Sequence, residues 1–196
     1  MAHIRSATTA DAGRMLEIYA HYVRHTAISF EWEVPSADEF RRRVETTLQR
    51  WPWLVIETDG AVRGYAYAGP HRTRASYGWC CEISIYLDPS ARRQGLGRAL
   101  YRALEDELKA MGILNLYAGV ACPEREDEFL DNNSLEFHTH LGFAQVGRLH
   151  RCGRKFGRWY DLAWMEKHIG PHAADQPPVI PWPQVSQRRR GGDAHD

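Results

Sequence analysis

The chain has 196 residues, a length that suits one globular domain. Apolar residues make up 43% and charged residues 26%, as in soluble globular proteins, so a packed core is expected. Basic and acidic residues both number 25, and this zero net charge excludes an overall field that would select nucleic acid or an anionic membrane. Four cysteines without a CxxC pair, and no secretory prefix, indicate a cytoplasmic protein. Apolar runs fall short of the ~20 residues that cross a bilayer, which excludes a membrane-spanning protein.

Two helices are predicted near the amino terminus, after a first strand at His3–Ala7. A capping box at Thr8–Asp11 precedes apolar residues from Met15 to Tyr22 that are spaced to share one helical face. Ser36 repeats the capping signal, and apolar residues then recur every four positions up to residue 48. We therefore expect a strand and two helices before the first hairpin.

The chain from residue 53 to about residue 166 alternates strands with two helices. The turn signal Asp59-Gly60 joins two strands, and Gly112 and Gly142 each end a helix. In chain order, the expected elements are strands at Trp53–Thr58, Ala61–Gly69 and Cys80–Leu87, a helix at Leu96–Leu108, a strand at Leu114–Val120, a short helix at Ser134–Leu141, and strands at Ala144–Leu149 and Trp159–Met165. This order predicts an α/β fold.

The composition changes after residue 167. Prolines and polar residues dominate the next twenty positions, and the triplet Arg188–Arg190 follows. We therefore expect one folded domain over residues 1–167 and a mobile tail over residues 168–196. The arginine triplet is interpreted as a solvated charge run, so no nucleic-acid partner is expected, and a nucleic-acid-binding arm is the alternative.

A segment rich in glycine and arginine, Arg92–Arg98, lies between a predicted strand and a predicted helix. Glycines let the backbone approach a ligand closely, and the free amides at a helix start attract phosphate oxygens. Four arginines against one aspartate in residues 88–102 concentrate positive charge there. We interpret the segment as a pyrophosphate-binding loop, and a tight turn that binds nothing is the alternative.

The loop also fits the pattern Arg/Gln-x-x-Gly-x-Gly-x-Ala-Leu, by which the chain resembles the GNAT family of N-acetyltransferases over about residues 3–166. Further motifs resemble its phosphinothricin acetyltransferase branch, namely Tyr67–Pro70, Tyr77–Trp79, Glu82–Leu87, Leu141–Phe143 and Gly153–Trp159. The resemblance implies the GNAT fold, a mixed and mostly antiparallel sheet flanked by helices. It also implies acetyl-CoA as co-substrate.

The resemblance assigns residues to acetyl-CoA. The backbone of Ile85, Tyr86 and Leu87 is expected to pair with the pantetheine arm, and a local bulge is expected to free an amide for the thioester oxygen. The phosphates are expected on Arg92, Arg93, Gln94, Gly95, Leu96, Gly97 and Arg98. Many relatives have Asn where this chain has Asp131, so Asn132 or Asn133 is expected to substitute, with Ser134 beside it.

Glu82 is the candidate general base. It lies on the strand that leads into the loop, and its apolar neighbours Ile83 and Ile85 are expected to desolvate the carboxyl and raise its pKa. In the family that this chain resembles, this glutamate is the proposed base. A strand-edge glutamate paired with an arginine is the alternative.

His138, on the short helix, is the second catalytic candidate. Many GNAT enzymes have at this place a tyrosine that protonates the leaving thiolate, and the resembling branch has histidine. Histidine can donate a proton near neutral pH. Two roles stay open: general acid or contact to the CoA sulfur, and a purely structural histidine.

Arg72, Arg74 and Tyr77 are the candidate acceptor-binding residues. The resembling enzymes bind an amino-acid-like substrate in this loop, and a guanidinium can hold a carboxylate or phosphinate through two hydrogen bonds. Surface arginines without a ligand are the alternative. The acidic residues of segment 123–131 are expected to be solvated, with selection of a basic substrate as the alternative.

Together these features predict an acetyl-CoA-dependent N-acetyltransferase for a small amino-acid-like amine, such as phosphinothricin or methionine sulfoximine. The alternatives are another amine, from an antibiotic or a peptide N-terminus, and a non-catalytic acyl-CoA-binding module. No metal is expected, because His21 and His25 lack a third ligand. The resemblance implies a homodimer, with Tyr77–Trp79 and Phe156–Tyr160 as candidate interface segments.

Overall fold

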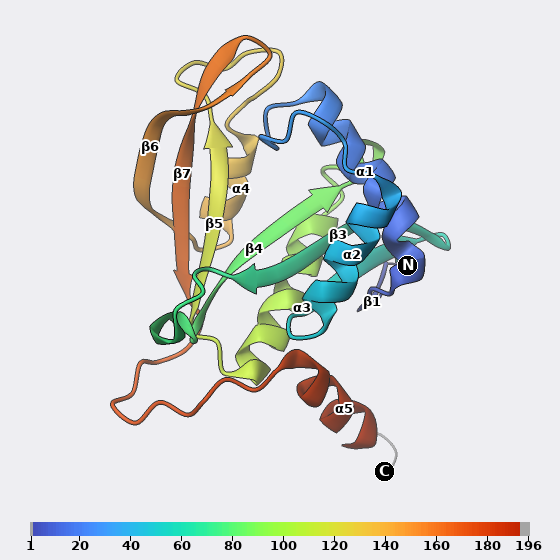
Figure 1. The fold of residues 1–196 in the computed structure, drawn as a ribbon, viewed down its shortest axis with the longest axis vertical. Helices are drawn as coiled ribbons and strands as arrows, with labels where there is room; N and C mark the ends of the chain where they lie inside the picture. Colours follow the sequence, from blue (N-terminus) through green and yellow to red (C-terminus); the bar gives the residue numbers. More distant parts are fainter. Residues whose placement is uncertain (1, 193–196) are drawn as a thin grey trace.

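The structure, a computed structural model, describes residues 2–192, with side chains described up to Arg188. Its sheet has the strand order β1-β2-β3-β4-β5-β7-β6 (Figure 1). The strands are β1 (His3–Ser6), β2 (Trp53–Thr58), β3 (Ala61–Pro70), β4 (Cys80–Leu87), β5 (Asn115–Cys122), β6 (Ala144–Lys155) and β7 (Arg158–His168). The α-helices are α1 (Ala12–His25), α2 (Ala37–Leu48), α3 (Leu96–Met111), α4 (Asn133–His140) and α5 (Trp182–Gly192). The predicted element order is confirmed as far as β7.

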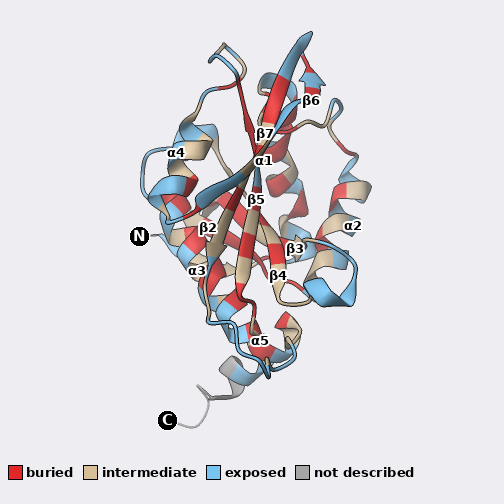
Figure 2. Cartoon of the chain, turned by 90° about the vertical axis from the view of Figure 1, so that its left-hand side faces the viewer, coloured by how far each residue is buried: buried red, intermediate tan, exposed pale blue. Residues whose placement is uncertain are grey.

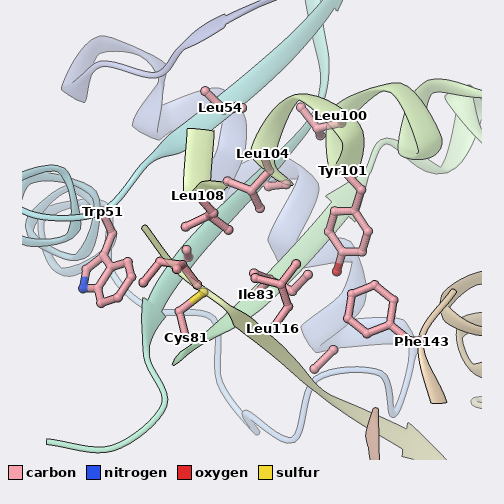
Figure 3. Packing of buried hydrophobic residues seen from close by; sticks show 14 of the residues in the cluster. Trp51, Leu54, Cys81, Ile83, Leu100, Tyr101, Leu104, Leu108, Leu116 and Phe143 are labelled. Carbon is pink, nitrogen blue, oxygen red and sulfur yellow. The ribbon is translucent and has the colours of Figure 1, made fainter. Parts of the chain in front are cut away.

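Helices cover both faces of the sheet, and each face has its own core. On one face, Leu100, Leu104 and Leu108 of α3 pack against Ile83 of β4 and Leu116 of β5 (Figure 3). The spacing of four residues puts the three leucines on one side of α3, which is why they are buried together. On the other face, α1 and α2 cover the aromatic side of β2 and β3. Figure 2 shows the buried residues in this interior and the exposed ones at its rim.

The sheet is divided between β4 and β5. Every other neighbouring pair of strands is antiparallel, and β4 and β5 are parallel. Among the described residues, their ladder holds only three pairs, from Cys80↔Asn115 to Glu82↔Tyr117. Beyond Glu82 the two strands diverge (Figure 1), because β4 stays paired with β3 and β5 stays paired with β7. The divergence leaves strand backbone without a neighbouring strand in the middle of the fold.

The carboxyl-terminal segment packs on the domain, which differs from the mobile tail expected for residues 168–196. Trp182 and Val185 of α5 are buried in the same core as α3. The Trp182 indole N–H donates to Glu107 at 3.0 Å, and the Trp79 indole donates to the carbonyl of Pro177 at 2.7 Å. Residues 193–196 of the expected tail lie outside the described residues. Within the described part, no helix has both the length and the apolar character needed to cross a membrane.

The packing of α5 predicts a loss of stability when its anchor is removed. Trp182→Ala takes a large aromatic side chain out of a closed site, which costs about 3 kcal/mol and lowers the melting temperature by roughly 6–12 °C. Trp32, which is 70% exposed in the segment between α1 and α2, supplies the matched control. Trp32→Ala is expected to change stability by less than about 0.5 kcal/mol. Equal melting temperatures in thermal denaturation of the two variants would contradict the packing of α5.

Candidate active site

The glycine-rich loop ends at the first residue of α3. Gly95 caps this helix with a φ of +77°, in the left-handed region that glycine adopts without strain. A Cβ atom built on Gly95 would meet no heavy atom within 4 Å, so its backbone borders open space. The amides at the start of α3 are therefore accessible to a ligand, as anion binding at a helix start requires.

A cavity of about 480 Å³, which we call the arginine-lined cleft, lies between the end of β4, the start of α3 and α4. Ten of the residues predicted for acetyl-CoA line it: Ile85, Leu87, Arg92, Arg93, Gly95, Leu96, Gly97, Arg98, Asn133 and Ser134. Gln94 and Tyr86 are not among its lining residues. The side-chain amide of Gln94 donates to the carbonyl of Ser90 at 3.4 Å, and the ring of Tyr86 packs against Tyr19 and Tyr22.

Gly97 has a different role from Gly95. A Cβ atom on Gly97 would lie 3.2 Å from the ring of Phe137 and 3.3 Å from Leu87. Both neighbours belong to the wall of the arginine-lined cleft, so a side chain at residue 97 would shift that wall. The second glycine of the motif thus allows α3 to pack closely on α4 and β4.

The positive charge of the loop faces the cleft, where three arginines and the single acidic residue Asp131 line the wall. Asp88, the only acidic residue of segment 88–102, is ion-paired with Arg14 and accepts a hydrogen bond from the backbone amide of Ser90. Arg92, Arg93 and Arg98 line the cleft, and the Arg92 guanidinium lies 5.4 Å from the ring centre of Tyr22. The cleft is therefore a site for an anionic ligand although the chain as a whole is neutral.

A smaller cavity of about 60 Å³, which we call the inter-strand cavity, lies between the diverging strands. Its walls are Ile83–Tyr86 of β4 and Ala118–Ala121 of β5, together with Ser134, His138 and Tyr101. The β3–β4 register runs without a shift from Gly64↔Leu87 to Pro70↔Cys81, so the bulge expected in β4 was a wrong prediction. Free backbone arises here because two strands separate rather than because one strand is irregular.

His138 is buried in the wall of the inter-strand cavity, and both of its ring nitrogens are engaged. Nδ1 lies 2.7 Å from the carbonyl oxygen of Ser134, which can only accept, so Nδ1 carries a proton. Nε2 lies 3.1 Å from the hydroxyl of Tyr101, which then donates to it. Burial lowers the pKa of His138 and favours this neutral ring. Its role as a general acid stays a prediction.

Glu82 lies at the vertex where β4 and β5 separate. Its side chain is 39% exposed, so the desolvation expected from Ile83 and Ile85 does not occur: those two residues face α3, and Glu82 alternates to the opposite face. Oε1 lies 3.0 Å from Nδ1 of His71 and 3.6 Å from the guanidinium of Arg72. The pairing with an arginine, which was the alternative interpretation, is present in the structure.

His71 was missed by the sequence analysis. Its ring stacks on Tyr117 of β5, with ring centres 4.3 Å apart and planes at 26°, and Trp164 of β7 meets it edge-on at 5.5 Å. A signal was available, because the β3–β4 hairpin places Gly69 opposite Glu82 and His71 two residues further on the same face. Diagonal neighbours of this kind are within reach of long side chains.

The structure brings two of the three predicted acceptor-binding residues to Glu82. Arg72 lies over the Trp164 ring at 5.8 Å and donates to the carbonyl of His71 at 2.8 Å. The ring of Tyr77 lies 6.0 Å from that of His71. Arg74 is exposed on the loop between them. Arg72 and Tyr77 therefore share a surface with Glu82.

The carboxylates of the acidic segment 123–131 contact other side chains of the protein. Arg158 bonds Glu128 at 2.7 Å and Asp127 at 2.9 Å. The other carboxylates also have partners: Glu124 with Arg151, Glu126 with Asn132, and Asp131 with Asn133. Glu126 and Asp131 bond neutral asparagine side chains, and Asp127 and Glu128 share one arginine. The segment therefore keeps net negative charge, and both interpretations of it stay predictions.

A divided sheet with an anion-binding helix start beside it is the architecture of acyl-CoA-dependent acyltransferases. Residues 4–164 match the family model described as acetyltransferase (GNAT) domain. The chain belongs to the GNAT family and is an acetyl-CoA-dependent N-acetyltransferase, as its sequence predicts. Among residues 2–192, His, Cys, Asp and Glu side chains form no group of three that could hold a metal ion.

Relatives of known activity cover most of the chain. It is 32% identical over 182 residues to a phosphinothricin N-acetyltransferase of Streptomyces viridochromogenes, covering 93% of this chain and 95% of that protein. It is 35% identical over 172 residues to an L-methionine sulfoximine/L-methionine sulfone acetyltransferase of Salmonella typhimurium, covering 87% and 96%. The crystal structure of a phosphinothricin acetyltransferase from Sinorhizobium meliloti in complex with AcCoA is similar with a TM-score of 0.82 at 34% identity, covering 93% and 96%. The predicted family, branch and fold are confirmed.

The geometry of Gly95 predicts that replacing this glycine weakens ligand binding by more than the accompanying loss of stability explains. Gly95→Ala and Gly60→Ala both place a methyl group at a φ near +75° in open space, so both lose about 1 kcal/mol of stability to backbone strain. Only Gly95 borders the cleft. Calorimetry is expected to show acetyl-CoA binding weakened about tenfold, or 1.4 kcal/mol, in Gly95→Ala and unchanged in Gly60→Ala. Equal affinities in the two variants would remove the loop from the binding site.

The buried neutral ring of His138 predicts a pH dependence of stability. Because its pKa is lowered in the fold, the stabilising contribution is complete above the unfolded value of about 6.5 and is lost as the pH falls below it. Urea unfolding at pH 7.5 and 5.5 should therefore show a smaller loss of stability in His138→Gln than in the wild type. His140→Gln, an exposed histidine on the same helix, is the control. An identical loss in all three proteins would contradict the burial of a neutral His138.

Proposed function

We propose that the protein moves the acetyl group of acetyl-CoA to the α-amine of a small amino-acid-like substrate of the phosphinothricin or methionine sulfoximine type. One observation carries the proposal: the opening between β4 and β5 has an arginine-lined cleft on the α3 side and, at its vertex, Glu82 with Arg72 on the opposite face. A donor and an acceptor can therefore approach the same opening from two sides.

The arginine-lined cleft fits acetyl-CoA by its charge and by its exposed backbone. Bound acetyl-CoA supplies a thioester whose carbonyl carbon an amine can attack. The amides at the start of α3 and the three arginines of the cleft bind the phosphates, since both favour anions. Ile85 of β4, which lies beyond the β4–β5 ladder, presents strand backbone to the pantetheine arm, whereas the backbone of Leu87 is hydrogen-bonded to the hydroxyl of Tyr22. Ser134 borders both cavities. Apart from that of Leu87, these roles agree with those implied by the family resemblance.

The acceptor side supplies a base and an anion clamp. Glu82, with the side chains that it contacts, removes the proton that the amine loses on attack. Arg72 and Arg74 hold the carboxylate of the substrate, and Tyr77 forms part of the surrounding wall. The names of the two curated relatives support this substrate class, because phosphinothricin and methionine sulfoximine each carry an α-amine next to a carboxylate. The predicted homodimer and cytoplasmic location stay predictions.

The proposed clamp predicts discrimination between an acid and its amide. A charge-assisted hydrogen bond to a carboxylate contributes about 1.5–3 kcal/mol, so the free amino acid is expected to be acetylated with at least a tenfold higher kcat/KM than its amide. Arg74→Ala is expected to raise the KM for the acid about tenfold and to leave a simple primary amine unchanged. Release of CoA over a panel of amines measures both effects.

Arg41→Ala, an exposed arginine on α2, is the matched control for the loss of a positive charge. A general electrostatic effect would weaken both arginine variants alike and would diminish at high salt. Equal acetylation of acid and amide by the wild type would exclude the amino-acid substrate class. An antibiotic or peptide amine would then be the favoured acceptor.

A further inference from the structure

We propose that His71 is the group that accepts the proton of the acceptor amine, and that Glu82 orients its ring. The inference deepens the proposed function and rests on it. It assigns a catalytic role to a residue outside all the motifs that the sequence analysis used, and it changes the role of Glu82 from base to partner of the base.

The hydrogen bond between the two side chains fixes which nitrogen is free. Nδ1 of His71 lies 3.0 Å from Oε1 of Glu82. An ionised carboxylate can only accept, so in the neutral ring Nδ1 carries the proton and Nε2 keeps a lone pair. The same arrangement occurs in the catalytic triads. There a carboxylate orients an imidazole, holds it in the correct tautomer and leaves its Nε2 free to act as the base.

The surroundings of His71 hold the ring in one orientation. Tyr117 stacks on one face at 4.3 Å, Trp164 meets the ring edge-on at 5.5 Å, and Tyr77 approaches at 6.0 Å. The His71 side chain is 14% exposed, compared with 39% for Glu82. A base that is held on three sides and still reaches solvent-accessible space can meet an incoming amine without losing further conformational freedom.

The charged and titratable groups around His71 come from four elements. Glu82 belongs to β4, Arg72 to the segment after β3, and Tyr77 to the short turn before β4. On β5, Tyr117 is bonded to Glu166 of β7, and burial together with this glutamate raises the pKa of Tyr117 to about 12, so its hydroxyl stays neutral. Glu82 is thus the carboxylate in direct contact with the ring, and the guanidinium of Arg72 lies beside that carboxylate.

The chemistry favours the imidazole over the carboxylate. A free imidazole is about two pH units more basic than a free glutamate side chain, and it is therefore better matched to an amine. Oε1 of Glu82 already accepts from His71 and lies 3.6 Å from Arg72. In the step itself, the amine nitrogen bonds to the acetyl carbon and its proton passes to Nε2 of His71. The carbon–sulfur bond breaks, its electron pair leaves on sulfur, and the thiolate takes a proton from solvent.

Replacement by asparagine separates this role from mere positioning of Glu82. His71→Asn keeps a side-chain N–H near the place of Nδ1 but has no Nε2, whereas His71→Phe keeps the stacking on Tyr117 and loses both nitrogens. If His71 is the base, both variants lose about 10²-fold or more in kcat, with acetyl-CoA affinity within twofold of the wild type. If His71 only holds Glu82, asparagine restores the rate, and that result would overturn the proposal.

The matched control is His150→Asn. His150 makes the same contact, with Nδ1 3.0 Å from a carboxylate oxygen of Asp161, but it lies on β6 away from the vertex of the opening. Its kcat is expected to equal that of the wild type. The amine in these assays is whichever one the wild type acetylates, so failure of the amino-acid substrate class shows in the wild type and failure of the base role shows only in the variants.

A second measurement needs no substrate. Nitrogen-15 NMR of histidine-labelled protein at pH 8 is expected to show His71 protonated at Nδ1 and bare at Nε2, and Glu82→Ala is expected to shift the ring toward the other tautomer. His71→Phe assigns the signal. A wild-type ring protonated at Nε2, alone or on both nitrogens, would overturn the proposal, because such a ring has no lone pair for the amine proton.

Discussion

The separation of β4 from β5 is the constraint on which the rest of the structure depends. A parallel pair of strands normally satisfies its backbone groups along its whole length, yet here only three pairs form. Each strand is held away from the other by a full antiparallel ladder on its outer side. Unpaired backbone in a protein interior is costly unless a partner is supplied. The feature that weakens the sheet also opens the inter-strand cavity, and under the proposed function an extended ligand arm supplies the missing partner.

The start of α3 lies near this opening because few residues separate it from the end of β4. β4 ends at Leu87, and the loop needs only eight residues to reach the helix at Leu96. The amides at the start of α3 therefore lie close to the end of β4. The charges are also arranged locally. Arg14 neutralises Asp88, and the loop arginines line the cleft. A chain of zero net charge thus builds a strongly positive site from a few neighbouring residues.

Local signals predicted most elements, because capping boxes, four-residue apolar spacing and the Asp59-Gly60 turn act over short stretches of chain. The glycine loop was predictable for the same reason. His71 was not recognised, since its partner Glu82 is eleven residues away and meets it only through the β3–β4 register. Helix α5 was missed because proline-rich surroundings masked Trp182 and Val185, whose burial depends on α3. The prediction of a bulge in β4 was wrong, because the free backbone results from the divergence of two strands, which is a property of the whole sheet.

The small size of the inter-strand cavity has a consequence for the choice of donor. Its volume of about 60 Å³ is one eighth of the roughly 480 Å³ of the neighbouring cleft. Much of its wall is strand backbone from β4 and β5, which cannot rotate away as a side chain can. Under the proposed function, the acyl group enters this cavity, so each added methylene has to displace strand backbone or one of the side chains of Tyr101, His138 and Ile83. Acyl-length selectivity is then set jointly by the separation of two strands and by the size of those side chains.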